Sequence, residues 1–127
     1  MIKGISITIV ADTIQQDAQL TQWVQLFQAG FSEPITYKSG KVYEKFEDCY
    51  KLEFEILAEN PAMYDREKWM YRLLLVSEAI ARPWLIYFDR DSDSTELIFN
   101  RTGQTKVAIP AFEVIRWAHL QFIYDVS

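Results

Sequence analysis

A regular alternation of apolar and polar side chains, found in two separate stretches, constrains the fold of this chain most strongly. From Ile5 to Ile9, isoleucines alternate with small hydroxyl residues, and over Tyr50–Leu57 large apolar residues alternate with lysine and glutamate. Successive side chains of a strand point to opposite faces of its sheet, so each stretch predicts a strand with one buried and one solvated face. We therefore expect strands over Ile2–Val10 and Tyr50–Leu57.

Two other segments follow the 3.6-residue period of a helix. In the first, apolar residues recur from Leu20 to Phe27 at helical spacing, and Gly30 is a plausible stop. We expect Asp12 or Thr13 to cap this helix, because Thr13 and Gln16 have the spacing of a capping box. In the second helix, Asp65 is the expected cap and Pro83 the limit. Its expected apolar face consists of Trp69, Met70, Leu73, Leu74, Val76 and Ile80.

The remaining patterns predict short strands and turns. Lys38–Lys41 has turn chemistry between the β-type segments Ile35–Tyr37 and Val42–Glu44, although Val42–Asp48 also fits a helix. The dense apolar run Trp84–Phe88 predicts another strand. Leu97–Phe99 and Lys106–Ile109 would then complete a β-meander, and a last helix would begin near Pro110.

Because these strands are joined mostly as hairpins, the expected fold class is α+β. We expect a mainly antiparallel sheet with two or three helices packed on one face. The 127 residues contain neither an internal repeat nor a linker-like tract, which predicts a single domain over residues 1–127.

Composition narrows the classes of function. The chain has 18 acidic and 13 basic residues, a net charge of −5, and this balance argues against bulk binding of nucleic acid. Trp84–Phe88 is the longest apolar run and is far shorter than the roughly 20 residues of a membrane-spanning helix. The single Cys49 allows no internal disulfide, so we expect a cytoplasmic protein without a membrane association.

No arrangement of residues predicts catalysis, and we expect no catalytic residue, no cofactor and no metal site. Cys49 and His119 are the only conventional nucleophile and base, and nothing in the sequence brings them together. Glu53 and Glu55 share one face of a strand, where they are expected to be solvated. The segment from Asp89 resembles the start of a calcium loop, but the glycine and the glutamate that such a loop requires are absent.

Negative charge is concentrated in one part of the chain. Residues 44–59 hold six acidic residues against two lysines, a net charge of −4 out of −5. Such a segment is either a solvated strand face or a recognition surface for a basic partner. In the second interpretation, the candidate partner-binding residues are Glu44, Glu47, Asp48, Glu53 and Glu55, with Asp89, Asp91 and Asp93 as an extension and Tyr43 and Tyr50 as anchors.

A small, acidic α+β domain with the acidic stretch Glu44–Glu59 and the loop Asp89–Asp93 resembles bacterial immunity proteins of contact-dependent growth inhibition and polymorphic toxin systems. The resemblance is one of general type, and no residue motif is matched. It implies a non-enzymatic inhibitor that binds a cognate protein toxin domain, such as a basic nuclease, and blocks its active site.

Two alternatives remain open at this point. One is a small-ligand-binding protein or enzyme with a pocket lined by Trp69, Trp84, Tyr87 and Trp117, although large aromatic residues at these spacings are more often core residues. The other is a homo-oligomeric interaction module, such as a homodimer joined through a sheet edge.

Overall fold

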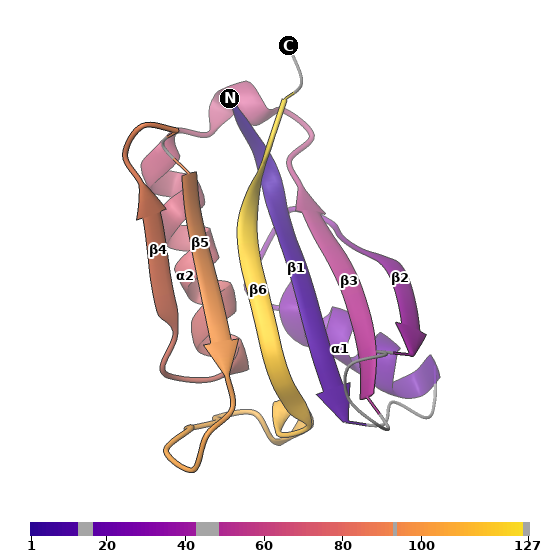
Figure 1. Ribbon diagram of the computed structural model, residues 1–127. Helices are drawn as coiled ribbons and strands as arrows, with labels where there is room; N and C mark the ends of the chain where they lie inside the picture. Colours follow the sequence, from indigo (N-terminus) through magenta and orange to yellow (C-terminus); the bar gives the residue numbers. More distant parts are fainter. Residues whose placement is uncertain (13–16, 43–48, 93, 126–127) are drawn as a thin grey trace.

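The computed structural model describes residues 1–12, 17–42, 49–92 and 94–125. These residues form a six-stranded antiparallel sheet with two α-helices, both on the same face of the sheet (Figure 1). The fold class is therefore α+β with a mainly antiparallel sheet, as the alternation predicts. The elements in chain order are β1 (Ile2–Asp12), α1 (Asp17–Gln28), β2 (Ile35–Val42), β3 (Cys49–Leu57), α2 (Arg66–Ile80), β4 (Leu85–Asp89), β5 (Ser94–Asn100) and β6 (Ile115–Tyr124).

The strand order is β2-β3-β1-β6-β5-β4, which places the N-terminal strand β1 in the middle of the sheet and leaves β2 and β4 at its two edges. β1 pairs with β3 on one side and with β6 on the other. Ile5, Ile7 and Ile9 of β1 are completely buried on the face that the helices cover. The expected strands over Ile2–Val10 and Tyr50–Leu57 are confirmed.

The two helices divide the covered face between them. α1 lies behind the β2 side of the sheet and α2 behind the β4 side (Figure 1). Trp23 and Phe27 of α1 are buried, and the Trp23 indole donates a hydrogen bond to the Ala111 carbonyl at 3.1 Å. Phe112 stacks on Phe27 with 5.1 Å between ring centroids, so the segment before β6 packs against α1 and contributes to the core.

The second helix begins as its sequence predicts. The Asp65 carboxylate accepts a hydrogen bond from the Lys68 backbone N–H at 2.8 Å, which satisfies one of the unpaired donors of the first turn. The helix ends at Ile80, before Pro83. Four of the expected apolar positions are buried, whereas the side chain of Leu74 is 42% exposed. This exposed leucine lies at the surface described below.

The predicted turn at Lys38–Lys41 is wrong. β2 runs without a break from Ile35 to Val42 along β3, with a register shift between Tyr37 and Ser39. The long neighbouring strand β3 supplies hydrogen-bond partners over this whole length. The residues with turn chemistry are accommodated in the strand by the register shift. The helical alternative for Val42–Asp48 fails at Val42, which belongs to β2, and residues 43–48 lie outside the described residues.

The predicted C-terminal helix is also wrong. Pro110–Phe112 forms only a short 3-10 turn, and Ile115–Tyr124 is the strand β6. Ala118, Leu120 and Phe122 alternate toward the core and cover the free edge of β1. The expected third meander strand over Lys106–Ile109 does not form, since Lys106 makes a single isolated bridge to Arg82.

Asp12 does not cap α1. It is the last residue of β1, and its carboxylate pairs with Arg101 at 2.9 Å and with Arg116. The capping residues expected at positions 13 and 16 lie outside the described residues. Among the helices that the structure describes, none combines the length and apolar character needed to cross a membrane.

Candidate functional site

The acidic residues of β3 lie on the open face of the sheet, opposite the helices. Glu53 lies 3.7 Å from the Lys51 ammonium, and Glu55 lies 3.8 Å from the Lys38 ammonium of β2. Each carboxylate therefore has a cation of this chain beside it. The described part of the acidic stretch is locally compensated, so it offers a basic partner a weaker field than its sequence indicates.

The other candidate partner-binding residues are dispersed. Tyr50 is half-buried in β3, and Asp89 and Asp91 are exposed at the connection between β4 and β5. Hydrogen bonds from the Ser92 side chain and from the backbone of Asp91 hold the pKa of Asp89 below its ordinary value. Five further candidates lie outside the described residues: Tyr43, Glu44, Glu47, Asp48 and Asp93.

Topology separates the two groups of acidic residues. Strands β1, β6 and β5 lie between β3, which carries Glu53 and Glu55, and β4, which ends in Asp89. Adjacent strands are about 4.8 Å apart, so the two groups are roughly 19 Å apart across the sheet. Asp89 and Asp91 do not extend the surface of Glu53 and Glu55, and the expectation of one continuous acidic surface is not met by these residues.

The potential catalytic residues also lie apart. Cys49 is buried at the end of β3 and donates a hydrogen bond to the Asp12 carboxylate at 3.7 Å. His119 lies on the open face opposite Thr8, where it bonds to Glu96 at 3.2 Å and stacks on Trp117. In the described parts of the chain, no three metal-binding side chains gather in one place.

The edge strand β4 has a different character, because all five of its residues are exposed. Four consecutive side chains are large and apolar. Their exposed fractions are 55% for Leu85, 63% for Ile86, 52% for Tyr87 and 55% for Phe88. Single exposed apolar residues are ordinary on a protein surface, but a contiguous apolar patch marks a binding site or a liability for aggregation.

The register of β4 with β5 assigns these side chains to faces. Ile86 and Phe88 oppose the buried Leu97 and Thr95, so they project on the helix side of the sheet. Leu85 and Tyr87 project on the open side. The strand is thus apolar on both faces, and its outer backbone edge has no partner strand among the described residues.

Helix α2 extends this apolar area on the helix side. The Arg66 guanidinium donates to the Thr95 hydroxyl at 3.1 Å and lies over the Phe88 ring at 5.8 Å, which places that side of α2 beside β4. Leu74 precedes Ser77 by three residues, and the Ser77 carbonyl accepts a bond from Trp84, so Leu74 lies on the same side of the helix. We name this area the β4 surface; it consists of Leu74, Leu85, Ile86, Tyr87 and Phe88.

An apolar pocket of about 260 Å³ adjoins the β4 surface on the open side. The Trp84 indole donates to the carbonyls of Ser77 at 2.9 Å and Ala81 at 2.8 Å, and its ring lies against Phe99. These contacts anchor the start of β4 to the end of α2. The pocket is lined by Pro83, Trp84, Leu85, Ile98, Asn100 and Thr102.

The expected aromatic pocket does not form from the four predicted residues together. Trp69 is buried in the core, Trp117 lies on the open face beside His119, and Trp84 lines the pocket. Sequence reasoning identified Trp84–Phe88 as a strand but did not identify it as a surface. An unbroken apolar run is typical of a strand buried on both faces, and only the strand order reveals that this one is at an edge.

Fold and surface together define a class of protein: an α+β domain with an open antiparallel sheet, one of whose edge strands is apolar and uncovered. In comparisons with protein-family models, curated proteins and solved structures, no match to this chain is found.

Proposed function

We propose that this chain is a non-enzymatic protein-binding domain that takes up a strand of a partner protein at the β4 edge. One observation carries the proposal: the free edge of the sheet is a strand of four consecutive exposed, large apolar residues. An added strand forms backbone hydrogen bonds with such an edge, and its alternate side chains contact the apolar residues on both faces.

The structure also bears on the alternative of a small-ligand site. The pocket beside β4 measures about 260 Å³, and two other pockets measure about 300 and 250 Å³. These volumes lie at or below the lower end of the roughly 300–1,000 Å³ typical of sites for small molecules. A pocket of this size adjoining an apolar edge suits a single side chain of a bound protein strand.

The resemblance to immunity proteins gives this proposal a specific form. In that form the partner is a cognate toxin domain, and the chain neutralises it by direct, stoichiometric binding. The β4 surface supplies the apolar centre of the interface, and the acidic residues supply peripheral charge, which affects the rate of encounter more than affinity.

The test is binding of the protein encoded by the gene adjacent to this chain's gene, measured by calorimetry. We expect Ile86→Lys to weaken binding by at least about 30-fold, because a central apolar anchor typically contributes 2 kcal/mol or more. The matched control is Thr36→Lys, which puts the same side chain on the exposed part of the opposite edge strand.

The double variant Glu53→Lys/Glu55→Lys separates the two surfaces. We expect it to change affinity by less than about fivefold, as is usual for peripheral charges. Loss of binding in this variant with full binding by Ile86→Lys would assign recognition to the acidic face and overturn the β4 proposal. An adjacent gene product that neither variant nor wild type binds would overturn the immunity form.

A further inference from the structure

The sequence of the β4 edge suits pairing of this strand with the same strand of a second copy. The run Trp84-Leu85-Ile86-Tyr87-Phe88 contains no charged residue, and its large apolar residues are arranged symmetrically about Ile86. We propose that β4 pairs antiparallel with β4 of a second copy of this chain, with Ile86 opposite Ile86 at a two-fold axis. This inference rests on the proposed function, because it names an occupant for the same edge; a toxin strand that binds there displaces the second copy.

In this register every opposed pair within the run from Trp84 to Phe88 is apolar. Ile86 faces its counterpart on the helix side, and Trp84 faces Phe88 of the second copy there as well. Leu85 faces Tyr87 of the second copy on the open side. Directly opposed Cβ atoms in an antiparallel pair lie about 4.5–5.5 Å apart, so each pair is in contact. A register shifted by one residue, centred on Tyr87, would instead place Leu85 against Asp89 of the second copy.

The pocket beside β4 fits the same register. Leu85 lines this pocket on the open side, together with Ile98 and Trp84. Because Leu85 opposes Tyr87 of the second copy, the phenol ring of that tyrosine reaches the pocket from across the two-fold axis. Tyrosine is a favoured residue at interface centres, where its ring is buried and its hydroxyl stays hydrated.

The residues that flank the apolar run bring charges of both signs together in this register. Beyond Phe88 follow two exposed aspartates and one arginine, at positions 89 to 91. In this register Arg90 comes level with exposed Arg82 of the second copy, and Asp89 and Asp91 lie diagonally on either side of that arginine. At each end of the pairing two aspartates therefore flank two arginines, and the two ends are equivalent by symmetry.

The two-fold axis is perpendicular to the sheet, so the helices of both copies lie on the same side of one continuous sheet. Ile86 is midway along the run from Trp84 to Phe88, and α2 passes this level near Met70 and Leu74, since Arg66 contacts Phe88 and Ser77 contacts Trp84. The exposed Leu74 of each copy therefore lies nearest the axis on the helix side. This placement accounts for an apolar residue on the outer flank of α2.

The area is of the right order for a small homodimer. Half-exposed side chains of this size each offer about 100 Å², so the five residues of the β4 surface offer about 500 Å² per copy. A standard interface buries about 800 Å² per partner. The strand backbone, the pocket and the charged residues that flank β4 supply the remainder.

The first experiment measures the mass of the full-length chain by sedimentation equilibrium over a concentration series. We expect a monomer–dimer equilibrium for the wild type and for Thr36→Lys, and at least about 30-fold weaker association for Ile86→Lys, because the pairing would place two ammonium groups together at the axis. Ile86 is 63% exposed, so the variant keeps its fold, which circular dichroism checks.

The second experiment fixes the register by disulfide trapping under mild oxidation. We expect Ile86→Cys to form a covalent dimer, and Leu85→Cys and Tyr87→Cys to cross-link only when the two variants are mixed. The wild type is the control, since its single cysteine, Cys49, is buried. Cross-linking of Tyr87→Cys by itself, without cross-linking of Ile86→Cys, would overturn the register.

The outcomes separate this inference from the proposed function. A wild-type chain that stays monomeric at every concentration overturns the inference alone, because a different protein strand can still occupy β4. A dimer that persists in Ile86→Lys also overturns it, since the contact then lies elsewhere. The proposed function fails independently, if toxin-domain binding is unaffected by Ile86→Lys.

Discussion

The two edges of the same sheet differ in charge and in regularity, two features that control strand pairing. The β2 edge carries Lys38 and Lys41, the glycine Gly40 and a register shift, and it is eight residues long. The β4 edge is a regular strand of five residues without lysine, proline or bulge, and its first four side chains are apolar. Natural proteins use edge lysines and local irregularities of this kind to prevent association of exposed edges. The contrast with β4 supports the proposal that a partner strand covers this edge.

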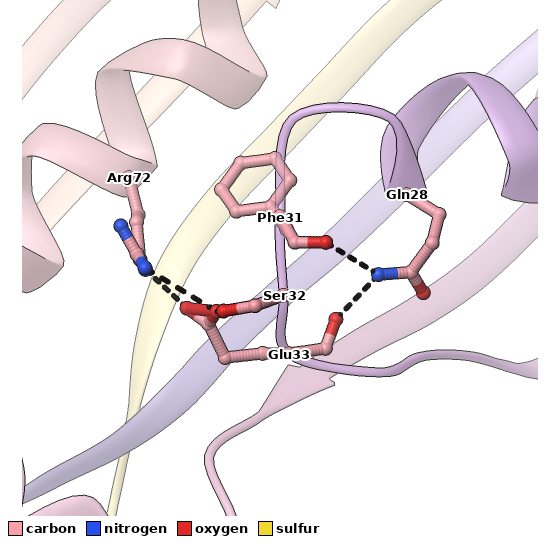
Figure 2. Close-up of polar contacts among 5 residues, drawn as sticks. All are labelled: Gln28, Phe31, Ser32, Glu33 and Arg72. Atoms are coloured by element: carbon pink, nitrogen blue, oxygen red, sulfur yellow. Dashed lines mark hydrogen bonds and ion pairs between the residues drawn. The ribbon is translucent and has the colours of Figure 1, made fainter.

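The edges also differ in how they are anchored. The Gln28 side chain donates to the carbonyls of Phe31 and Glu33 (Figure 2). It also accepts a hydrogen bond from the Ile35 N–H, which fixes the start of β2. The buried Glu33 carboxylate also forms an ion pair with Arg72 of α2 (Figure 2). β4 relies instead on the Trp84 indole and on Arg66. Side-chain hydrogen bonds and an ion pair therefore hold the start of β2, whereas all five residues of β4 are exposed.

The largest expected effect comes from breaking the anchor of β2. Glu33→Gln leaves the Arg72 guanidinium partly buried without a counter-ion, so we expect a loss of about 3 kcal/mol in the free energy of unfolding. Denaturant titration measures it. Arg72→Lys is the companion variant, and an unchanged midpoint in both would show that this pair does not anchor the edge.

The same pair gives stability a pH dependence. Burial acts to raise the pKa of Glu33, but hydrogen bonds from Arg72 and Ser32 together outweigh it and hold the pKa below its ordinary 4.5. A lowered pKa in the folded state stabilises the protein above the unfolded value, so this contribution is lost as the pH falls through and below 4.5. Glu33→Gln should flatten this part of the stability–pH curve relative to wild type.

The next largest effect concerns association and not stability. We expect Ile86→Lys to change the free energy of unfolding by less than about 0.5 kcal/mol, as is usual for an exposed position. The same variant should lose at least about 2 kcal/mol of association free energy. Thermal denaturation of a dilute sample and sedimentation of a concentrated one measure the two quantities. A large loss of stability in the dilute monomer would mean that β4 needs Ile86 for folding.

A smaller effect is expected when the β2 edge is made to resemble β4. Lys38→Ile together with Lys41→Val removes two edge charges, including the partner of Glu55. We expect a modest change in stability, about 0.5 kcal/mol, and a measurable gain in concentration-dependent light scattering. Light scattering as low as that of wild type would show that the register shift and Gly40 protect this edge without the lysines.

The smallest effect is expected at the acidic face. Glu53→Lys/Glu55→Lys removes two exposed ion pairs, each contributing about 0.2–1 kcal/mol, and should leave self-association at β4 unchanged. Sedimentation at low and high salt measures this. Dissociation of the dimer by this variant would place the contact on the open face at β3, which three strands separate from β4.

Local sequence patterns were sufficient to predict an element where one of its faces is buried and the other is solvated. The alternation in Tyr50–Leu57 and the cap Asp65 with its helix were predicted correctly, because side-chain period and capping chemistry act within the element itself. Prediction failed for β6, where Phe112, Ile115 and Phe122 also fit helical spacing. The decisive factor was the edge of β1, which requires a second partner strand.

At the candidate site, too, the sequence determined the local chemistry and long-range pairing determined the position of the strand. Apolar character, absence of charge and strand propensity of Trp84–Phe88 are properties of the sequence, and they would suit a central strand equally well. Only the tertiary structure decided that β4 lies at the end of the order β2-β3-β1-β6-β5-β4, exposed on both faces. The physical reason is that strand order depends on long-range backbone pairing, to which residues distant in the chain contribute. The sequence by itself determined the class of fold and the chemistry of each strand, and tertiary pairing determined which strand became a surface.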